Sequence, residues 1–430
     1  MKNSILIIFI ACLSFSSCDL FNDLFGNKDK DPVYNANIVW KSNLESNDYT
    51  SQILYGDSVL FFESAPEYFD GNASVLTMLD ARTGQLIWRS KAVFSSTIFS
   101  QPLVIDRHVY VFLQPRIILC FNIETGEQTA TINVDIDNKG FEFYWYFPVA
   151  HKEYIYLSLS LPRSYFVRLD SRIINQSGDY KIMQMVSPEI LWEPENNNRS
   201  VVETTPVIYN NTIFTATSGF RDRPIEIAGF DLDSLEMIFH CTFGGTQDQI
   251  DYGDNLVHYD RGNGKILTNE GILYYIGDSR SAWDIASGEK LYRYVQLYSN
   301  PYSERTHSDC LQPVHYNGYI YYTNMTGYSN GGRMRNIHCI DTVTGKLVWN
   351  TIAYDSASLK TNPIIANGKL FVPQSHGFFV FDTKTGKLRG VDKTFYGSDT
   401  CRNLLYNDLL ICLRKDKGYY GKLVAVNVGK

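Results

Sequence analysis

The chain has 430 residues, of which 39 are basic and 46 acidic, giving a formal net charge of −7. This balance argues against a nucleic-acid surface, because phosphate binding needs clustered Lys and Arg. Aromatic residues make up 14% of the chain, with 30 Tyr and 25 Phe, and apolar spacing typical of helices is scarce. The composition favours one large all-β domain.

The N-terminus predicts export and lipidation. Lys2 supplies a positive charge, residues 5–13 form a short apolar segment, and two serines precede Cys18. This order resembles a bacterial lipoprotein signal, in which the cysteine is lipidated and becomes the new N-terminus. Phe15 departs from the Leu that is usual three residues before that cysteine. We expect residues 1–17 to be removed and Cys18 to carry the lipid; the alternative is an ordinary secretory signal with an incidental cysteine.

The segment after the cysteine predicts a flexible tether. Residues 18–36 continue as DLFNDLFGNKDKDPVYNA after Cys18, and Asn, Asp, Lys, Gly and Pro dominate their second half. Such a segment cannot bury a hydrophobic core. The folded domain is therefore expected to cover residues 37–430, and no later apolar run is long enough to cross a bilayer as a helix.

One phrase recurs along this domain. IHCIDTVTGKLVWN at 337–350 shares its aspartate and Thr-Gly pair with LTMLDARTGQLIW at 76–88 and FFVFDTKTGKLRG at 378–390. The Asp or Asn before the turn marks each copy: Asp80, Asn122, Asp170, Asp231, Asp284, Asp341, Asp382 and Asn427. The gaps run from 41 residues (341 to 382) to 61 residues (170 to 231). This spacing is typical of a four-stranded propeller blade with variable loops.

A second pattern precedes every marker. It is an apolar strand, a tight polar turn and another apolar strand, as in QPLVIDRHVYVFL at 101–113 and QPVHYNGYIYYTN at 312–324. Such turns between apolar runs predict β-hairpins. Each unit therefore contains two hairpins, which make four antiparallel strands.

The residues of the first phrase have physical roles. The marker side chain caps its turn, and the glycine four residues later takes a left-handed conformation. The bulky ring eight residues after the marker fills the wedge between neighbouring blades, which is a far commoner role than ligand stacking. The repeat anchors expected on this basis are Asp80, Gly84, Trp88, Asp341, Gly345, Trp349 and Trp40.

The chain ends predict how the ring closes. The last unit has a hairpin at 403–415 and a third strand, LVAVNV, at 423–428, and the chain stops before a fourth. NIVWKS at 37–42 is a lone strand with the anchor Trp40. We expect it to supply the missing strand, pairing the two termini and removing two exposed edges. The prediction is an all-β, eight-bladed β-propeller.

The phrase L-D-x-x-T-G-x-x-x-W resembles the repeat of the pyrroloquinoline-quinone (PQQ) propeller superfamily over nearly all of residues 37–430. Within it, the organisation is similar to the BamB-like outer-membrane lipoproteins, which combine lipidation with a single eight-bladed propeller and no chemistry. This resemblance implies a non-catalytic, monomeric scaffold without a cofactor. It also implies lipid anchoring to the outer membrane of the cell envelope and a protein partner there. Whether the domain faces the periplasm or the cell surface stays open.

Two other functions are compatible with the propeller. Quinoprotein dehydrogenases of the superfamily carry PQQ and calcium over the axis, with an adjacent Cys-Cys disulfide and a catalytic aspartate. This chain has no adjacent cysteines and is shorter than those enzymes. The third hypothesis is a surface lipoprotein that binds a glycan or small ligand. The scattered cysteines lack the paired spacing of a zinc site, so no metal is expected.

Polar residues are expected at the mouth of the central channel, where loops enter the innermost strands. His307 and Asp309 lie in ERTHSDC at 304–310. His307 could act as a general base with the Asp309 carboxylate beside it, or the two could bind a metal. Glu203, Lys360 and Arg402 approach the mouth by the same register. The commoner alternative is a hydrogen-bonded lining without catalytic use.

Long insertions are the better functional indication, because rigid scaffolds usually bind through loops. They fall at 171–191, at 242–264 and at 324–336, NMTGYSNGGRMRN. In the last of these, Tyr328, Arg333 and Arg335 could form a rim contact, or the segment could be a mobile loop. The insertion at 242–264 includes three aspartates, but their spacing is not that of a calcium loop.

Overall fold

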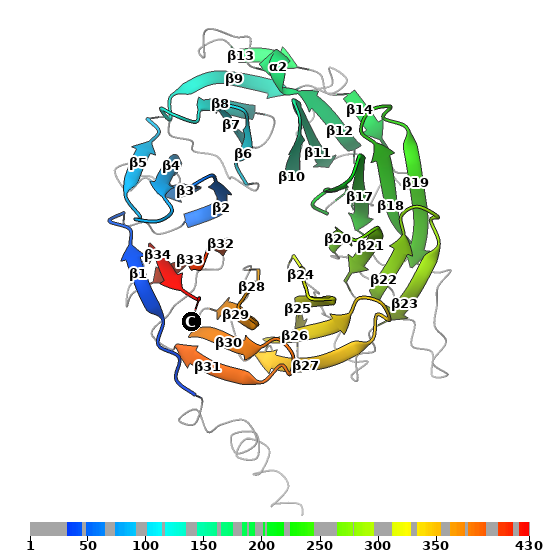
Figure 1. Cartoon of the computed structure of the whole chain (residues 1–430). Helices are drawn as coiled ribbons and strands as arrows, with labels where there is room; N and C mark the ends of the chain where they lie inside the picture. Colours follow the sequence, from blue (N-terminus) through cyan, green and yellow to red (C-terminus); the bar gives the residue numbers. More distant parts are fainter. Residues whose placement is uncertain are drawn as a thin grey trace, which may run out of the picture.

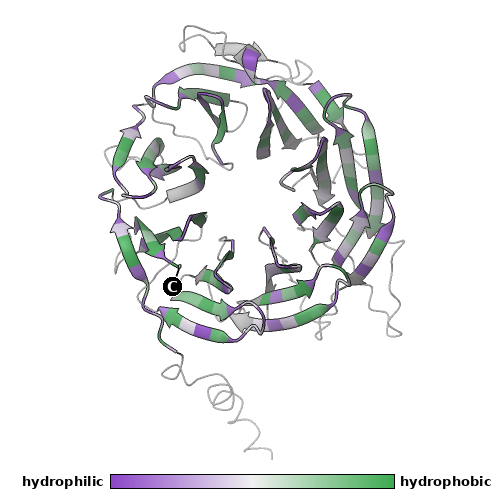
Figure 2. Ribbon diagram, in the orientation of Figure 1, coloured by the Kyte–Doolittle hydropathy of each residue, from purple (hydrophilic) through white to green (hydrophobic). Residues whose placement is uncertain are grey.

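The computed structural model describes the parts of the chain that build the ring in Figure 1. These are residues 32–44, 49–64, 74–91, 101–113, 117–134, 144–160, 165–174, 183–186, 189–193, 201–202, 204–218, 224–244, 265–277, 279–295, 312–327, 333–353, 362–374, 377–392, 403–415 and 421–429. They form eight sheets arranged radially around one axis, which confirms the predicted eight-bladed propeller. Hydrophobic residues occupy the strands, and hydrophilic residues gather at the turns (Figure 2).

The first four blades follow one another along the chain, each with its strands in order from the axis outward. Blade one contains β2 (Tyr49–Tyr55), β3 (Ser58–Ser64), β4 (Ser74–Asp80) and β5 (Leu86–Arg89). Blade two contains β6 (Leu103–Ile105), β7 (His108–Leu113), β8 (Ile117–Asn122) and β9 (Gln128–Val134). Blade three contains β10 (Tyr144–His151), β11 (Tyr154–Ser160), β12 (Tyr165–Asp170) and β14 (Glu189–Trp192). Blade four contains β16 (Val207–Tyr209), β17 (Thr212–Ser218), β18 (Pro224–Asp231) and β19 (Met237–Gly244).

The second half of the chain repeats the arrangement. Blade five contains β20 (Lys265–Asn269), β21 (Ile272–Ile276), β22 (Ser279–Asp284) and β23 (Lys290–Val295). Blade six contains β24 (Val314–Tyr316), β25 (Tyr319–Gly327), β26 (Arg333–Asp341) and β27 (Leu347–Ala353). Blade seven contains β28 (Ile364–Ala366), β29 (Lys369–Gln374), β30 (Gly377–Asp382) and β31 (Leu388–Asp392). Blade eight contains β32 (Leu404–Tyr406), β33 (Leu409–Lys415) and β34 (Gly421–Asn427).

The two ends of the chain meet in blade eight. β1 (Asn37–Lys41) pairs antiparallel with β34 and supplies the outer strand of that blade. This confirms the predicted closure and leaves no gap between blades eight and one. Each of the eight markers is the last residue of the third strand of its blade, as the repeat predicts.

The insertion at 171–191 forms structure that the sequence does not predict. A one-turn helix, α2 (Ser171–Ile174), replaces the marker turn of blade three. Further on, β13 (Met183–Val186) adds to the outer strand of blade two as a parallel fifth strand, pairing Met183 with Thr131 and Val186 with Val134. β15 (Val201–Val202) pairs with the far end of β17 in blade four.

The tight turns explain why these residues form these hairpins. In blade six, Asn317 and Gly318 have φ angles of 50° and 78°, the left-handed conformation that a two-residue hairpin turn requires. In the marker turn, Asp341 Oδ1 accepts hydrogen bonds from the backbone N–H of Thr344 at 2.7 Å and from its hydroxyl at 2.8 Å. These bonds stabilise the carboxylate and lower the pKa of Asp341.

Hydrophobic packing occurs between blades, because each sheet buries both of its faces against its neighbours. The described core consists of eight clusters, one at each blade boundary. The cluster between blades one and two, for example, packs Phe62 and Trp88 against Val109 and Phe121. No single blade could bury these side chains alone, so the ring stabilises itself through its boundaries.

The anchor rings make the same contact at several boundaries. Trp88 of blade one lies against the turn of blade two, and its Nε1 donates a hydrogen bond to the Ile123 carbonyl at 2.7 Å. A Cβ placed at Gly126 would lie only 2.4 Å from the Trp88 ring. The same contact joins Trp40 to Gly84, Trp349 to Gly386 and Tyr292 to Gly345. The glycine therefore serves both the left-handed turn and the close approach of the ring.

Blade seven lacks its own anchor and has a substitute. Gly390 stands eight residues after Asp382, where other copies carry a ring. Tyr34, from the segment before β1, lies there instead: a Cβ at Gly390 would meet the Tyr34 Cβ at 2.7 Å, and the Tyr34 ring stacks on Phe378 at 5.9 Å. The described end of the predicted tether is thus packed on the propeller.

Two glycines allow the effect of the left-handed turn to be measured separately from the effect of the ring contact. Gly126 and Gly288 have nearly the same φ, 70° and 71°, but a Cβ at Gly288 would meet nothing within 4 Å. Gly288→Ala should cost about 1 kcal/mol of unfolding free energy, from left-handed strain alone. Gly126→Ala should cost about 2 kcal/mol more, because the added methyl displaces Trp88.

Chemical denaturation of the two purified variants measures this difference. Equal losses would mean that the ring contact contributes nothing beyond the turn. A larger loss for Gly288→Ala would contradict the assignment of Gly126 as the docking position.

Candidate binding surface

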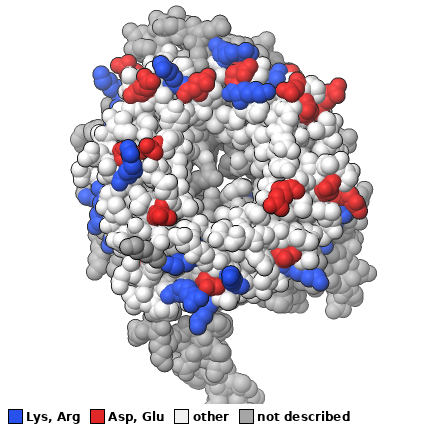
Figure 3. All heavy atoms as spheres, in the orientation of Figure 1, with Lys and Arg blue, Asp and Glu red and all other residues white. Residues whose placement is uncertain are grey.

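The ring presents two faces and an outer rim. The inner hairpin turns and the marker turns lie together on one face, which we call the turn face. The opposite face, at the other ends of these strands, we call the connection face. The centre of the ring is hollowed in Figure 3.

The structure does not place the predicted channel-mouth residues. Glu203, His307, Asp309, Lys360 and Arg402 lie outside the described residues, as do Cys18 and Tyr328. Their roles stay predictions.

Next to these positions, the described chain forms a belt of amide side chains around part of the axis. Gln312 Nε2 donates to the Ile266 carbonyl of blade five at 3.4 Å, and the Gln312 backbone N–H donates to Asn362 Oδ1 of blade seven at 3.2 Å. Asn403 Nδ2 of blade eight donates to the Asn362 carbonyl at 3.1 Å. These bonds hold the starts of the inner strands in blades six to eight, directly after the candidate residues. The starts of these inner strands therefore form a fixed frame.

The insertion at 324–336 differs from the expected loop. Residues 324–327 continue β25 and residues 333–336 begin β26, paired from Asn324↔Asn336 to Gly327↔Arg333. Arg333 and Arg335 are thus strand residues, and only positions 328–332 of this segment lie outside the described chain. An extended hairpin is stiffer than a loop because its backbone hydrogen bonds are paired, so the interpretation as a loop is wrong for these strand residues.

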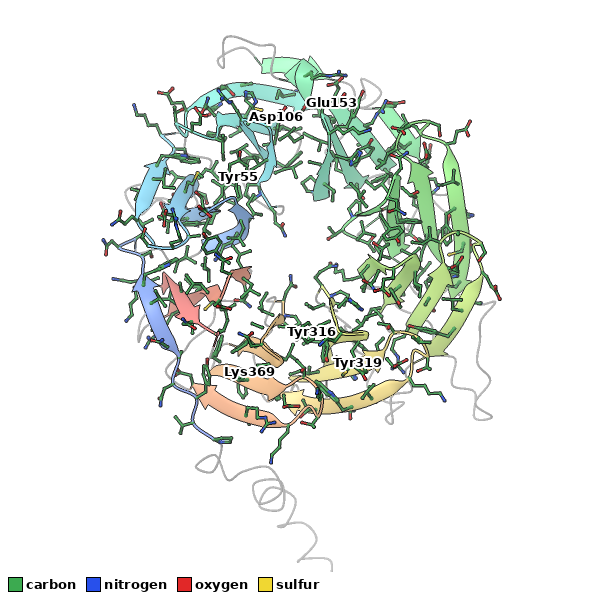
Figure 4. All side chains as sticks on the ribbon, viewed as in Figure 1. Tyr55, Asp106, Glu153, Tyr316, Tyr319 and Lys369 are labelled. Carbon is green, nitrogen blue, oxygen red and sulfur yellow. The ribbon has the colours of Figure 1, made fainter. Side chains whose placement is uncertain are left out.

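Tyrosines link neighbouring blades on the turn face. The Tyr55 hydroxyl donates to the Asp106 carbonyl of the next blade at 3.3 Å. The Tyr406 hydroxyl donates to Asp57 Oδ1 across the closing boundary at 2.6 Å, which raises the pKa of Tyr406. Figure 4 labels Tyr55 and Asp106 on these inner turns, together with Glu153, Tyr316, Tyr319 and Lys369. Tyrosine hydroxyls therefore bridge two of the blade boundaries on this face.

Charged side chains of both signs are distributed around the ring (Figure 3). Several form exposed pairs on the turn face, such as Lys152 with Asp233 at 3.4 Å between blades three and four, and Arg172 with Glu153 at 3.4 Å. Exposed pairs of this kind contribute little to stability. Among the described residues on the face in Figure 3, positive and negative side chains alternate.

The outer rim carries apolar side chains that sequence reasoning missed. Leu86 and Ile87, Met237 and Ile238, and Leu347 and Val348 begin the outer strands of blades one, four and six, each 44–57% exposed. They stand six and seven residues after the marker, where the register between third and fourth strands shifts by a β-bulge. The sequence contained a signal for this surface. In these three copies two consecutive apolar residues precede the anchor ring, although alternation along an outer strand should make one of them polar.

The described residues offer little reactive chemistry. Among them, no group of three His, Cys, Asp or Glu side chains could hold a metal ion. Burial raises the pKa of the Cys241 and Cys339 thiols to about 12, so both are protonated at neutral pH and are poor nucleophiles. In the described part of the chain, no helix has the length and apolar character needed to cross a bilayer.

One buried histidine has a strongly altered titration. His338 of β26 is 3% exposed, and its ring stacks on Tyr322 at 4.8 Å. Burial, with a smaller contribution from the positive charge of Arg280, lowers the pKa of His338 to about 4. The ring is therefore neutral in the folded protein over most of the acidic range.

Comparison with known proteins places the chain in a family. The sequence model of the outer membrane protein assembly factor BamB matches residues 34–324. The factor of that name from Yersinia pestis is 20% identical over 356 residues, covering 80% of this chain and 75% of the relative. The one from Shewanella oneidensis is 23% identical over 324 residues, covering 72% and 67%.

Solved structures that align with this fold include proteins of quite different description. Quinohemoprotein alcohol dehydrogenase ADHIIG from Pseudomonas putida HK5 aligns with a TM-score of 0.62 at 12% identity, over 91% of this chain and 76% of that one. Sqt1 from Saccharomyces cerevisiae aligns with a TM-score of 0.60 at 11% identity, over 91% and 100%. At such identities the likeness shows the fold alone.

His338 predicts a pH dependence of stability. Its ordinary pKa is 6.5 and its folded pKa is about 4, so the unfolded chain binds the proton more readily. The free energy of unfolding should therefore fall as the pH drops from 6.5 to 4, by up to about 1.4 kcal/mol per pH unit from this group. Above pH 6.5 His338 contributes nothing further to the pH dependence of the free energy of unfolding. His338→Phe, which can still stack on Tyr322, should remove this part of the slope.

Denaturation curves recorded between pH 4 and 7 test this, with the exposed His240→Gln as a matched histidine control. Wild-type and His338→Phe protein with equal slopes would contradict the assignment. An NMR titration of the His338 ring gives an independent reading of the same pKa.

Proposed function

We propose that this chain, which belongs to the family of the outer membrane protein assembly factor BamB, is a non-catalytic scaffold that binds a protein partner at the outer membrane. The family match over residues 34–324 is the observation that carries the proposal. The described geometry is compatible with it, because the ring is a rigid support whose functional variation lies in loops and rim. We propose no cofactor for this function.

Lipidated Cys18 would hold the scaffold at the membrane. The described chain begins at Pro32, whose carbonyl accepts a hydrogen bond from the Val391 N–H at 2.8 Å in the outer strand of blade seven. The tether of residues 18–31 would therefore leave the disc at its rim, beside blades seven and eight (Figure 1). A lipid there would place this part of the rim nearest the membrane, with blades three and four farthest away. A processed lipoprotein cysteine carries several acyl chains, which makes such anchoring stable.

Cross-linking in the native membrane tests whether such a partner binds. Cells producing the tagged, lipidated protein are cross-linked, solubilised in mild detergent and affinity-purified, and the captured proteins are identified by mass spectrometry. We expect a subunit of the barrel-assembly machinery to be enriched over an unrelated lipoprotein bait. We also expect outer-membrane β-barrel proteins to be depleted in cells that lack the gene. Cys18→Ala should lose the partner and should not restore the barrel proteins, because the scaffold is no longer held at the membrane.

Two matched sets of substitutions locate the contact. One combines Tyr328→Ala, Arg333→Ala and Arg335→Ala in blade six; the other combines His307→Ala and Asp309→Ala at the channel mouth. Loss of the partner with one set and retention with the other would assign the binding surface. Enrichment equal to the unrelated bait, together with unchanged barrel proteins, would overturn the scaffold proposal.

A further inference from the structure

The exposed charges on the rim of the disc are divided unevenly between two sets of blades. Each blade reaches the rim through its outer strand and through the marker turn that leads into this strand. In the described residues of these segments, blades six, seven, eight and one expose only basic charges: Lys346, Lys384, Lys387, Arg389, Lys41 and Arg82. The same segments of blades two, three and four expose one basic residue, Arg172 of α2, beside a majority of acidic ones: Glu124, Glu127, Glu189, Asp233 and Glu236. We call the rim of blades six, seven, eight and one the basic half.

The chain enters the disc in the middle of this basic half. The Val391 N–H of blade seven donates to the Pro32 carbonyl at 2.8 Å, and β1 then begins at Asn37 as the outer strand of blade eight. Residues 32–37 therefore pass from blade seven to blade eight, which are adjacent in Figure 1. Figure 3 shows basic side chains at the bottom of the disc, where blade seven lies. A surface that holds the N-terminal tether therefore meets the basic half first.

Exposed apolar side chains lie between these basic residues. Val39, Ile87 and Val348 each stand directly before the anchor position of their blades, as Arg389 does in blade seven, so the four side chains lie at the same height on the rim. The three apolar ones are 50%, 48% and 48% exposed, and Val33 beside the chain entry is 77% exposed. Apolar side chains flanked by Lys and Arg are typical of surfaces that lie in the interface of a membrane.

The other half of the rim shows that apolar exposure alone does not select a surface. Met237 and Ile238 of blade four are 44% and 57% exposed, but Asp233 and Glu236 lie in the turn directly before them. An anionic surface would repel this blade and attract blades seven and eight. Its potential also reaches the neighbouring blades, because charges in physiological salt act over about 8 Å.

We propose that the basic half of the rim lies on an anionic phospholipid surface, the membrane to which Cys18 anchors the chain. The disc then stands edge-on, and blades two to four and both faces are left open to protein partners. This inference rests on the lipid anchoring in the proposed function. Vesicles without protein separate the two, because the lipid contact can fail while the protein partner is still captured from cells, and the reverse.

The first test measures vesicle binding without the lipid anchor. Mature protein, produced without residues 1–17 and with Cys18→Ala, is sedimented with vesicles of phosphatidylglycerol and phosphatidylcholine or of phosphatidylcholine alone. We expect binding to the anionic vesicles only, and its loss at high salt, because salt screens the attraction. Combining Lys41→Gln, Lys384→Gln and Lys387→Gln should weaken binding roughly a hundredfold, because each basic side chain near an anionic surface contributes about fivefold.

A matched set of substitutions controls for net charge. Arg107→Gln, Lys152→Gln and Lys290→Gln together remove three exposed basic charges from blades two, three and five. This set should leave vesicle binding unchanged, because those blades face away from the surface. Equal weakening by the two sets, or equal binding to the uncharged vesicles, would overturn the proposal.

The second test leaves every side chain unaltered, so misfolding cannot imitate its result. The lipidated protein is inserted into anionic vesicles that contain a photoactivatable phospholipid, and the adducts are mapped by mass spectrometry after illumination. We expect adducts within residues 32–44 and 384–392 and none within residues 233–244. Adducts spread evenly around the rim would contradict the edge-on contact. Absence of adducts from the basic half, with loss of the protein captured from cells when its three lysines are replaced, would assign this surface to a protein instead.

Discussion

The structure depends on one recurring contact, in which an aromatic ring of an outer strand packs on the turn of the next blade. At the boundary of blades one and two, the Trp88 ring lies where a side chain at Gly126 would stand, and its N–H is bonded to the Ile123 carbonyl. This contact fixes the separation and the angle of two sheets that no strand connects. The same contact supports the closure of the ring, because it joins Trp40 of the N-terminal strand to Gly84 of blade one.

The propeller was predictable because its signals are local and repeated. A two-residue turn with residues suited to left-handed φ specifies a hairpin wherever it stands, and the marker with its glycine specifies the second hairpin of each unit. Even the ring closure followed from counting, because one strand was missing at the C-terminus and one was spare at the N-terminus. Blade three shows where the signal fails. Its marker turn lacks the Thr-Gly pair, and Arg172 bonds to Asp170 in place of a threonine, beside a one-turn helix.

The parts that could not be predicted are non-local and short. β13 pairs with a strand of another blade over four residues, and its sequence MQMV has no feature that specifies that strand as its partner. Tyr34 replaces a ring that the seventh copy has lost, although it lies 348 residues before that copy's marker, Asp382. The channel-mouth candidates illustrate a different limit, since Glu203, His307, Asp309, Lys360 and Arg402 all fall outside the described residues. What can be seen beside them is the frame of Gln312, Asn362 and Asn403.

Radial packing also decides where such a protein can bind. The broad faces of the sheets are buried between blades. Burial also keeps the Cys241 and Cys339 thiols protonated. Binding is left to the two faces of the disc and to the outer edges. A loop on either face recognises a particular side-chain pattern, whereas an outer edge recognises extended backbone and therefore tolerates many sequences.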